Sequence, residues 1–381
     1  MRAESKSTSG KRRLVNKDTD SRTPLNLSEY EELAKSVLDK AAYDYYRSGA
    51  NDELTLAENL QAYKRIQLYP RVLVDVEQRD LTTSVLGQEI SMPIMIAPTA
   101  FHKMACTLGE IATAQAAEAN ETLMVLSSLS NTSPEEIAGS TKGPLWFQLY
   151  IYKDRTLTKS VIQRVEKLGY KALCITVDAP LLGRRERDVR NRFSLPDGLR
   201  IATVGDYLEK SMAENSKTSS LNVYFASLLD QSITWKDIEW IRSISELPII
   251  VKGIHRPDDA IKAIEHGIDG IVVSNHGARQ LDTVPATIDL LPSISNAVNG
   301  KLEIFLDGGI RRGTDVIKAI ALGARAVLIG RPILWGLAVD GVNGASSVLR
   351  LIKDETDLAM ALCGISRISE ANKDLIGYRN A

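Results

Sequence analysis

A histidine and an arginine three residues apart are the chain's strongest candidates for chemistry. The segment Ser274-Asn275-His276-Gly277-Ala278-Arg279 follows a short apolar run, so we expect both side chains at the end of a β-strand. An imidazole titrates near neutral pH, and a guanidinium grips a carboxylate through two parallel hydrogen bonds. The pair therefore indicates proton abstraction from a carboxylate-bearing substrate, with His276 as the base and Arg279 as the anchor.

Among the other titratable residues, we expect one to interact with His276 and several to have no role in the chemistry. Asp178 also follows a predicted strand, from where it could orient the imidazole of His276 and stabilise its charge. His102, His255 and His266 lack such company, and we interpret His266 as the C-terminal residue of a helix. No Cys/His ligand spacing is present, so no metal site is expected.

Eight short apolar runs alternate with helical segments, which is typical of a parallel sheet. The predicted strands are Pro93–Ala97, Thr122–Leu126, Leu145–Leu149, Ala172–Val177, Pro248–Val251, Gly270–Val273, Glu303–Leu306 and Ala326–Ile329. The helical stretches between them include Gly109–Asn120, Arg155–Leu168, Pro257–His266 and Arg312–Leu322, and most end in Gly or Asn. Eight such units predict an α/β fold of the (β/α)₈ TIM-barrel type, although the pattern alone also allows an open doubly wound sheet.

Two helices are expected ahead of the barrel. Apolar residues recur at helical spacing over Leu27–Leu38, behind Asn26 and Ser28 as possible N-caps. A second helix carries Tyr45 and is expected to stop near Gly49, a residue that suits a helix C-terminus.

Two segments fall outside this alternation. Residues 1–24 are polar and basic, and we interpret them as a flexible arm; an organelle-targeting segment, peroxisomal or mitochondrial, and a weak polyanion contact are the alternatives. A stretch of about 45 residues, about 190–234, follows the fourth strand and includes the polar run Met212–Ser220. A loop there lies over the active-site face, so it predicts a lid on a single barrel domain spanning residues 25–381.

Bulk composition favours a soluble, intracellular globular enzyme. Hydrophobic residues make up 44% and charged residues 25% of the chain, and the formal net charge of −1 gives no field that attracts nucleic acid. There is no apolar run of membrane-spanning length and no secretory signal, and the chain does not end in the Ser-Lys-Leu peroxisomal address. Cys106, Cys174 and Cys363 are expected to be buried, reduced thiols.

Nearly every predicted strand ends in a polar residue, at the end of the barrel where active sites lie. The residues at these strand ends are Pro98-Thr99-Ala100, Ser127-Ser128, Gln148 and Tyr150, Thr176 and Asp178, Lys252, Ser274 to Arg279, Asp307-Gly308-Gly309 and Gly330-Arg331. The last two groups follow strands seven and eight, where glycine turns, a helix N-terminus and Arg311 or Arg331 predict a phosphate site.

Read in order, these residues resemble the family of FMN-dependent 2-hydroxy acid oxidases and dehydrogenases from about Leu27 to Arg367. The stretches that carry the resemblance are Ala42–Ala50, Pro93–Ala100, Gln148–Tyr150, Leu182–Glu186, Ser274–Gln280 and Asp307–Gly313. The resemblance implies an FMN enzyme that oxidises glycolate, L-lactate or both, and a homo-oligomer, a tetramer or octamer.

The resemblance also implies a role for each matching residue. Tyr45, Arg185 and Arg279 would hold the substrate carboxylate and Tyr150 its hydroxyl, with His276 as base and Asp178 behind it. Lys252 would sit near flavin N1 and O2. The remaining cofactor-binding residues would be Pro98, Thr99, Ala100, Ser127, Gln148, Thr176 and Ser274 at the ring, Asp307 at the ribityl chain, and Gly308, Gly309, Arg311, Gly330 and Arg331 at the phosphate.

One departure bears on the substrate. Where the plant glycolate oxidase pattern has Ser-Ser-Trp, this chain has Ser127-Ser128-Leu129, which leaves a roomier apolar wall. We therefore expect L-lactate to be used at least as well as glycolate, because filling such space with a methyl group is worth about 1–3 kcal/mol.

Several alternatives stay open. The acceptor for the electrons is expected to be oxygen, giving hydrogen peroxide, with a dehydrogenase that uses a quinone or a cytochrome as the alternative. Whether a carbanion forms or hydride moves is also open, and both routes use His276. Other phosphate-binding barrels, such as type 2 isopentenyl diphosphate isomerase or inosine monophosphate dehydrogenase relatives, lack the Ser-Asn-His-Gly-Ala-Arg arrangement. A non-enzymatic polyanion-binding protein, working through the basic arm, is the alternative of another class.

Overall fold

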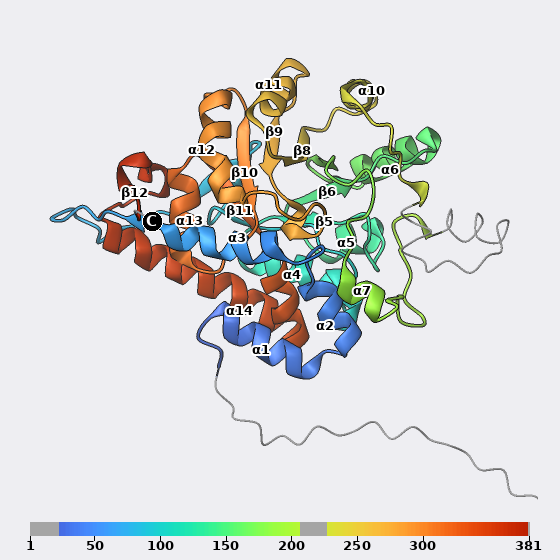
Figure 1. The fold of residues 1–381 in the computed structure, drawn as a ribbon, viewed down its shortest axis with the longest axis horizontal. Helices are drawn as coiled ribbons and strands as arrows, with labels where there is room; N and C mark the ends of the chain where they lie inside the picture. Colours follow the sequence, from blue (N-terminus) through green and yellow to red (C-terminus); the bar gives the residue numbers. More distant parts are fainter. Residues whose placement is uncertain (1–22, 206–226, 380–381) are drawn as a thin grey trace, which may run out of the picture.

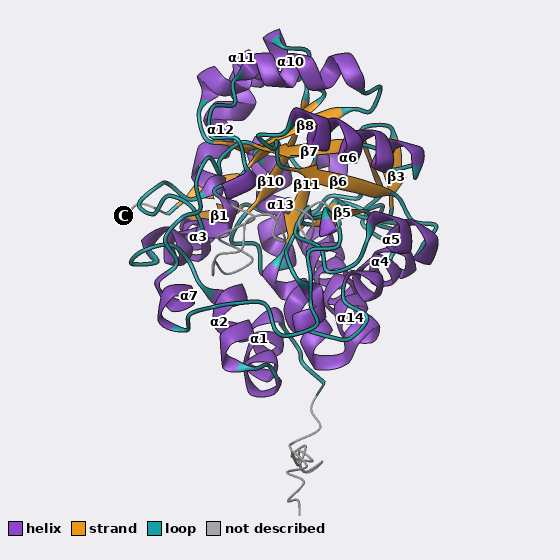
Figure 2. Cartoon of the chain, turned by 90° about the vertical axis from the view of Figure 1, so that its right-hand side faces the viewer, coloured by secondary structure: helices purple, strands orange, loops and turns teal. Residues whose placement is uncertain are grey.

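Eight parallel strands close into a barrel in the computed structural model, which describes residues 23–205 and 227–379. The strands gather at the centre of the molecule with helices around them (Figure 2). They are β4 (Ile94–Ile96), β5 (Met124–Leu126), β6 (Leu145–Leu149), β7 (Leu173–Thr176), β8 (Ile249–Ile254), β9 (Gly270–Val273), β10 (Glu303–Asp307) and β11 (Ala326–Ile329). All eight predicted strands are confirmed, and the closed barrel excludes the open sheet.

Helices connect the strands on the outside of the barrel (Figure 1). They are α4 (Glu110–Ala119), α5 (Pro134–Ser140), α6 (Arg155–Lys167), α10 (Trp235–Ile244), α11 (Pro257–Glu265), α12 (Thr287–Val298), α13 (Gly313–Ala321) and α14 (Arg331–Cys363), the last interrupted at Asp340 and Gly341. Gly169, Gly267 and Gly323 follow α6, α11 and α13 with positive φ angles, which confirms the predicted helix-to-strand returns.

Between residue 23 and the first barrel strand, the described chain forms three helices: α1 (Leu27–Val37), α2 (Lys40–Arg47) and α3 (Leu54–Arg65). Asn26 caps α1 as predicted, whereas Ser28 lies inside the helix. The helix α2 stops at Arg47, close to Gly49 as predicted, but its C-cap is Ser48 in an extended conformation, and Gly49 does not adopt the positive φ of a helix-ending glycine. A Cβ at Gly49 would lie 3.1 Å from the carbonyl oxygen of Ala278, so glycine is needed there for close approach of the loop after β9.

The barrel interior is built in two layers. The lower layer is apolar and buried; it consists of Met95, Val125, Trp146, Cys174, Ile250, Val272, Phe305 and Leu328. Because side chains alternate along a strand, the residue two positions further on points the same way and forms the upper layer. The upper layer is Ala97, Ser127, Gln148, Thr176, Lys252, Ser274, Asp307 and Gly330. The change from apolar to mostly polar side chains marks the functional end of the barrel.

A hairpin closes the opposite end. Strands β2 (Thr83–Val85) and β3 (Gln88–Ile90) pair in antiparallel fashion, and both contribute apolar side chains to the lower layer. The indole N–H of Trp146 donates to the side-chain oxygen of Gln88 at 2.9 Å. Near the C-terminus, β12 (Ile376–Tyr378) pairs with β1 (Ile66–Leu68) and joins the end of the chain to its N-terminal part.

The remaining predictions concern segments at the margins. Most of the arm predicted at residues 1–24 and the whole run Met212–Ser220 lie outside the described residues. The described parts of 190–234 follow a short helix, α7 (Glu186–Arg190), which packs against α2. All three cysteines are free, but Cys106 is only half-buried. Within the described ranges, no helix combines the length and apolar character needed to cross a membrane.

Candidate active site

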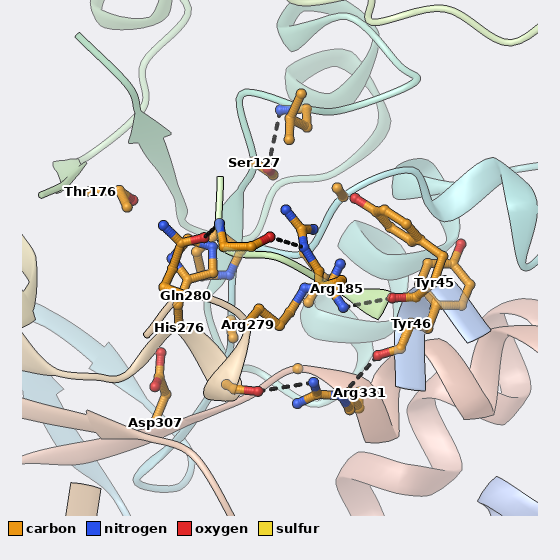
Figure 3. Close-up of a pocket in the computed structure, with 18 of the residues that line it drawn as sticks. Tyr45, Tyr46, Ser127, Thr176, Arg185, His276, Arg279, Gln280, Asp307 and Arg331 are labelled. Carbon is orange, nitrogen blue, oxygen red and sulfur yellow. Dashed lines mark hydrogen bonds between the residues drawn. The ribbon is translucent and has the colours of Figure 1, made fainter. Parts of the chain in front are cut away.

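A cavity of about 550 Å³ opens above the upper layer, at the carboxyl ends of the strands. This volume is within the range of cofactor and substrate sites. All but two of the predicted site residues line it, from the strands β6, β7, β8 and β10, from α2 and from the loops that follow the strands. They are Tyr45, Pro98, Thr99, Ala100, Ser127, Leu129, Gln148, Tyr150, Thr176, Arg185, Lys252, His276, Arg279, Asp307, Gly308, Gly309, Arg311, Gly330 and Arg331. Figure 3 shows several of them around the cavity. The exceptions are Asp178 and Ser274, which lie just behind the wall.

The first exception, Asp178, contacts the imidazole of His276. The two residues follow β7 and β9, which flank β8, and the His276 Nδ1 to Asp178 Oδ1 distance is 2.9 Å. Burial raises the pKa of Asp178, but His276, Lys252 and His255 together outweigh it and leave the pKa below its ordinary value. Because this carboxyl is ionised, Nδ1 carries the proton and Nε2 keeps a lone pair.

Burial also makes His276 a neutral base. Desolvation lowers its pKa, the carboxylate of Asp178 raises it, and Lys252 lowers it, with a net result below the ordinary histidine value. The backbone holds the ring in place through three successive positive φ angles at His276, Gly277 and Ala278. Such strain persists only where neighbours enforce it, and here the side chain of Asn275 accepts from the N–H of Ala278 at 3.2 Å.

Two arginines face the cavity near this histidine. Arg279 donates to the carbonyl oxygens of Tyr45 at 2.6 Å and Ser48 at 3.1 Å, and its guanidinium lies 4.8 Å from the Tyr45 ring centroid. Its pKa is lowered by burial and by the second arginine, Arg185, whose side chain is 12% exposed. Two cations on a partly buried cavity wall can bind both oxygens of a carboxylate.

Two further arginines, Arg311 and Arg331, line the cavity next to this pair. No ion pair joins either residue to a carboxylate among the described residues. Arg331 donates instead to three backbone carbonyls, those of Tyr46, Ser48 and Gly277, at 2.8–2.9 Å. Burial lowers its pKa well below the ordinary value, and Arg279 and Arg311 add to the effect. Partly buried cations without a counter-charge are costly, so this end of the cavity fits a phosphate.

The nearby glycines are needed for a reason that the sequence did not reveal. Gly308 and Gly309 have φ angles of 98° and 85°, and a Cβ at Gly309 would lie 1.9 Å from the carbonyl oxygen of Asn59 in α3. The absence of a side chain at these glycines therefore lets α3 approach the turn. From the sequence, we had expected the glycines to allow a phosphate to approach the backbone.

The floor of the cavity carries a buried polar cluster. Lys252 Nζ donates to Ser274 Oγ at 3.0 Å, and Ser274 Oγ donates to Asp307 Oδ2 at 2.9 Å. Burial opposes the charge on Lys252, but Asp307 and Asp178 outweigh it and raise its pKa. Oδ1 of Asp307 is buried without a hydrogen-bond partner in the described structure. An unpaired acceptor beside the cavity fits a ligand that donates hydroxyl groups.

Several lining residues were missed by sequence reasoning. Phe193 stacks on Tyr45 with ring centroids 4.3 Å apart, and Asp188 lies 3.8 Å from Arg185. Gln280 donates to the backbone carbonyls of Asp178 and Leu181 and ties the two loops together. Spacing offered one signal: Asp188 is three residues after Arg185, within reach on a helix.

The other three histidines have different surroundings in the structure. His266 ends α11 as predicted and stacks on Trp235 at 5.1 Å. Nε2 of His255 is buried and lacks a hydrogen-bond partner among the described residues. The ring of His102, for which no partner was predicted, contacts the side chains of two threonines. No cluster of three or more potential metal ligands occurs in the described part of the chain.

Comparison with known proteins places this chain in a family. The family model for FMN-dependent dehydrogenases matches residues 34–378 of the sequence. The L-lactate oxidase of a Nostoc species is 54% identical over 93% of this chain and 98% of its own length. The human 2-hydroxyacid oxidase 1 is 54% identical over 92% of this chain and 95% of its own, and the spinach glycolate oxidase is 50% identical over the same shares.

Solved structures show the same fold. A mandelate oxidase variant with (S)-mandelic acid is 35% identical, with a TM-score of 0.85 over 94% of this chain and 99% of that one. A soluble mutant of the membrane-associated (S)-mandelate dehydrogenase from Pseudomonas putida is also 35% identical, with a TM-score of 0.86 over 94% of this chain and 100% of that one.

Proposed function

The chain belongs to the family of FMN-dependent dehydrogenases, and from that premise we propose that it is an (S)-2-hydroxy acid oxidase acting on L-lactate and glycolate with oxygen as acceptor. That it oxidises 2-hydroxy acids with FMN follows from relatives that are 50–54% identical over most of the chain. The choice of substrate, the acceptor and the roles of individual residues are the proposal.

The residues of the cavity suit FMN at both of its ends. Arg311 and Arg331 would hold the phosphate, since both are partly buried cations that form no ion pair among the described residues. Asp307, with one unpaired carboxylate oxygen, would accept from the ribityl hydroxyls. Lys252 lies on the floor, where a fixed ammonium favours negative charge on a ring above it. When bound, FMN supplies the two-electron acceptor that amino-acid side chains cannot provide.

The observation that carries the proposal is the neutral His276 held by Asp178 at 2.9 Å beside two arginines. Arg279 and Arg185 bind the substrate carboxylate with help from Tyr45, and the phenol of Tyr150 binds the hydroxyl. His276 Nε2 then takes a proton, either from the α-carbon or from the hydroxyl, and Asp178 stabilises the imidazolium that results. Removal of the α-proton would leave an electron pair on the α-carbon, whereas removal of the hydroxyl proton would let the α-hydrogen leave as hydride with its bonding pair; bound FMN would supply the two-electron acceptor in either case.

Anaerobic reduction of the bound flavin tests these roles without involving the acceptor. L-lactate is expected to bleach the flavin absorbance of the wild-type holoenzyme rapidly. His276→Gln is expected to retain FMN and slow bleaching about 10²–10⁴-fold, the usual contribution of a general base. Bleaching at the wild-type rate in this variant would contradict the assignment.

Leu129 supports L-lactate as a substrate. Its half-buried side chain lines the cavity and presents an aliphatic surface where a bulkier ring would reduce the space. A methyl group placed against such a wall is worth about 1–3 kcal/mol. The ratio of kcat/KM for L-lactate and glycolate tests this, and a strong preference for glycolate would overturn it.

The acceptor, assembly and lid complete the proposal. Oxygen as acceptor, with hydrogen peroxide as product, is supported by relatives named as oxidases. The likeness to a membrane-associated mandelate dehydrogenase makes a quinone or cytochrome the second candidate. We also propose a homo-oligomeric intracellular protein with a single catalytic domain, in which the described parts of residues 190–234 contribute to a lid, since Arg192, Phe193 and Leu229 line the cavity. Light scattering of the purified protein tests the assembly.

A further inference from the structure

His102 connects the wall of the cavity to a buried helix. It begins a short 3₁₀ helix, η1 (His102–Met104), and is fully buried. Its Nε2 lies 2.7 Å from the hydroxyl oxygen of Thr99, a residue that lines the cavity. Its Nδ1 lies 2.7 Å from the hydroxyl oxygen of Thr113, which is fully buried in α4. Both ring nitrogens therefore form short hydrogen bonds.

The surrounding backbone keeps this ring in place. The N–H of His102 donates to the carboxylate of Glu110 at 3.1 Å. The same buried carboxylate accepts from the N–H of Asn131 at 2.9 Å and from the hydroxyl of Thr132 at 2.9 Å. One residue earlier, the carbonyl of Phe101 accepts from the hydroxyl of Tyr46 at 2.6 Å. A ring fixed on this frame has few ways to relax, so the direction of its two hydrogen bonds matters.

The available protons determine that direction. Burial lowers the pKa of His102 despite Glu110 and the Thr99 carbonyl, so the ring is neutral and carries one N–H. The hydroxyl of Thr113 has two acceptors in reach: Nδ1 at 2.7 Å and the carbonyl of Gly109 at 3.5 Å. A hydrogen bond of 3.5 Å is weak, so the hydroxyl donates to Nδ1. The N–H of His102 is then on Nε2 and donates to Thr99.

We propose that His102 is a positioning residue that fixes the hydroxyl of Thr99 as a hydrogen-bond donor toward the cavity. Because Thr99 accepts from His102, its own proton is free to point at the ligand. This inference rests on the proposed function and on the role that the family resemblance implies for Thr99, a contact with the flavin ring. An oxidised isoalloxazine presents unprotonated nitrogens and carbonyl oxygens, which are acceptors, so a donor at Thr99 favours its binding.

Histidine ¹⁵N spectroscopy of the holoenzyme tests the direction without measuring activity. The chain has four histidines, so the ring signals are few, and the signals lost in His102→Gln identify those of His102. The proton of His102 is expected on Nε2. A proton on Nδ1, or a doubly protonated ring at neutral pH, would overturn the proposal.

FMN binding to the apoprotein tests the consequence. His102→Leu removes both hydrogen bonds and is expected to weaken FMN binding about two- to tenfold, the value of one net hydrogen bond, with a change in the flavin absorption spectrum. His102→Gln offers an amide donor and a carbonyl acceptor on one side chain and is expected to restore both properties. Thr99→Val is expected to match His102→Leu, and the double variant to lose little more.

The outcomes separate this inference from the proposed function. A wild-type protein that fails to bind FMN contradicts the proposed function, whereas the position of the His102 proton can be measured in either case. Unchanged FMN affinity and spectrum in His102→Leu would overturn the positioning role. Additive losses in the double variant would do so as well, because His102 would then act independently of Thr99.

Discussion

Replacement of Asp178 by Asn is expected to reduce the rate of flavin reduction about a thousandfold. The carboxylate lies 2.9 Å from Nδ1 of His276, with 6% of its side chain exposed. Two unit charges whose centres are about 4 Å apart attract by about 4 kcal/mol at an effective dielectric constant of about 20. This attraction is absent in the variant when the imidazolium forms, and each 1.4 kcal/mol is worth about a factor of ten in rate.

The pH dependence of the variant gives a second, directional readout. The base must be neutral, so the rate falls as the pH drops through the pKa of His276. Burial already lowers this pKa, and Asp178 opposes the decrease. Without the carboxylate, the pKa of His276 falls further, so the acidic limb moves to lower pH while the plateau rate falls. General damage to the fold would lower the plateau without moving the limb in this direction.

Anaerobic stopped-flow measurement of flavin bleaching by L-lactate, repeated across pH, provides the assay. Asp188→Asn is the matched control, because it removes a carboxylate from the same cavity at 3.8 Å from Arg185. The acidic limb is expected to stay in place in this control. A limb that moves to higher pH in Asp178→Asn, or a plateau within tenfold of wild type, would refute the reasoning.

Three further predictions address specificity, anchoring and stability. Leu129→Trp is expected to lower the ratio of kcat/KM for L-lactate to kcat/KM for glycolate by about 10–200-fold. The control Leu129→Met is expected to leave this ratio nearly unchanged. An unchanged ratio in Leu129→Trp would show that other residues determine the selectivity. Arg279→Lys is expected to lower kcat/KM about 10–150-fold, because a charged hydrogen bond is worth about 1.5–3 kcal/mol, with exposed Arg256→Lys as the control for steady-state assays. Trp146→Ala is expected to lower the free energy of unfolding by about 3–5 kcal/mol in urea titration, because a fully buried indole leaves a cavity in the lower layer; a loss below about 1 kcal/mol would contradict the two-layer description.

Much of the fold could be predicted because barrel strands are buried on both faces. Runs such as Gly270–Val273 are buried throughout and are short continuous apolar segments. The site followed from the same pattern, since the polar residues that end these runs occupy one layer. Trp146 and Gln148 illustrate this. They are two positions apart on the same strand and point the same way, but Trp146 lies in the apolar core and Gln148 lines the cavity.

Features that depend on contacts between distant segments could not be predicted. Gly49 is required by the approach of Ala278, and Gly309 by the approach of Asn59, so neither spacing nor helix-end statistics identifies the cause. His102 lacked company along the sequence because its second partner, Thr113, belongs to the following helix. Phe193 comes from a segment without periodicity, and only the folded chain brings it onto Tyr45.

The amount of hydrogen peroxide formed per 2-oxo acid produced from L-lactate tests the central claim most directly. The purified holoenzyme, in air and without an added acceptor, is expected to form the two products in equal amounts. Formation of pyruvate only after addition of a quinone or a cytochrome, without hydrogen peroxide, would contradict the assignment as an oxidase.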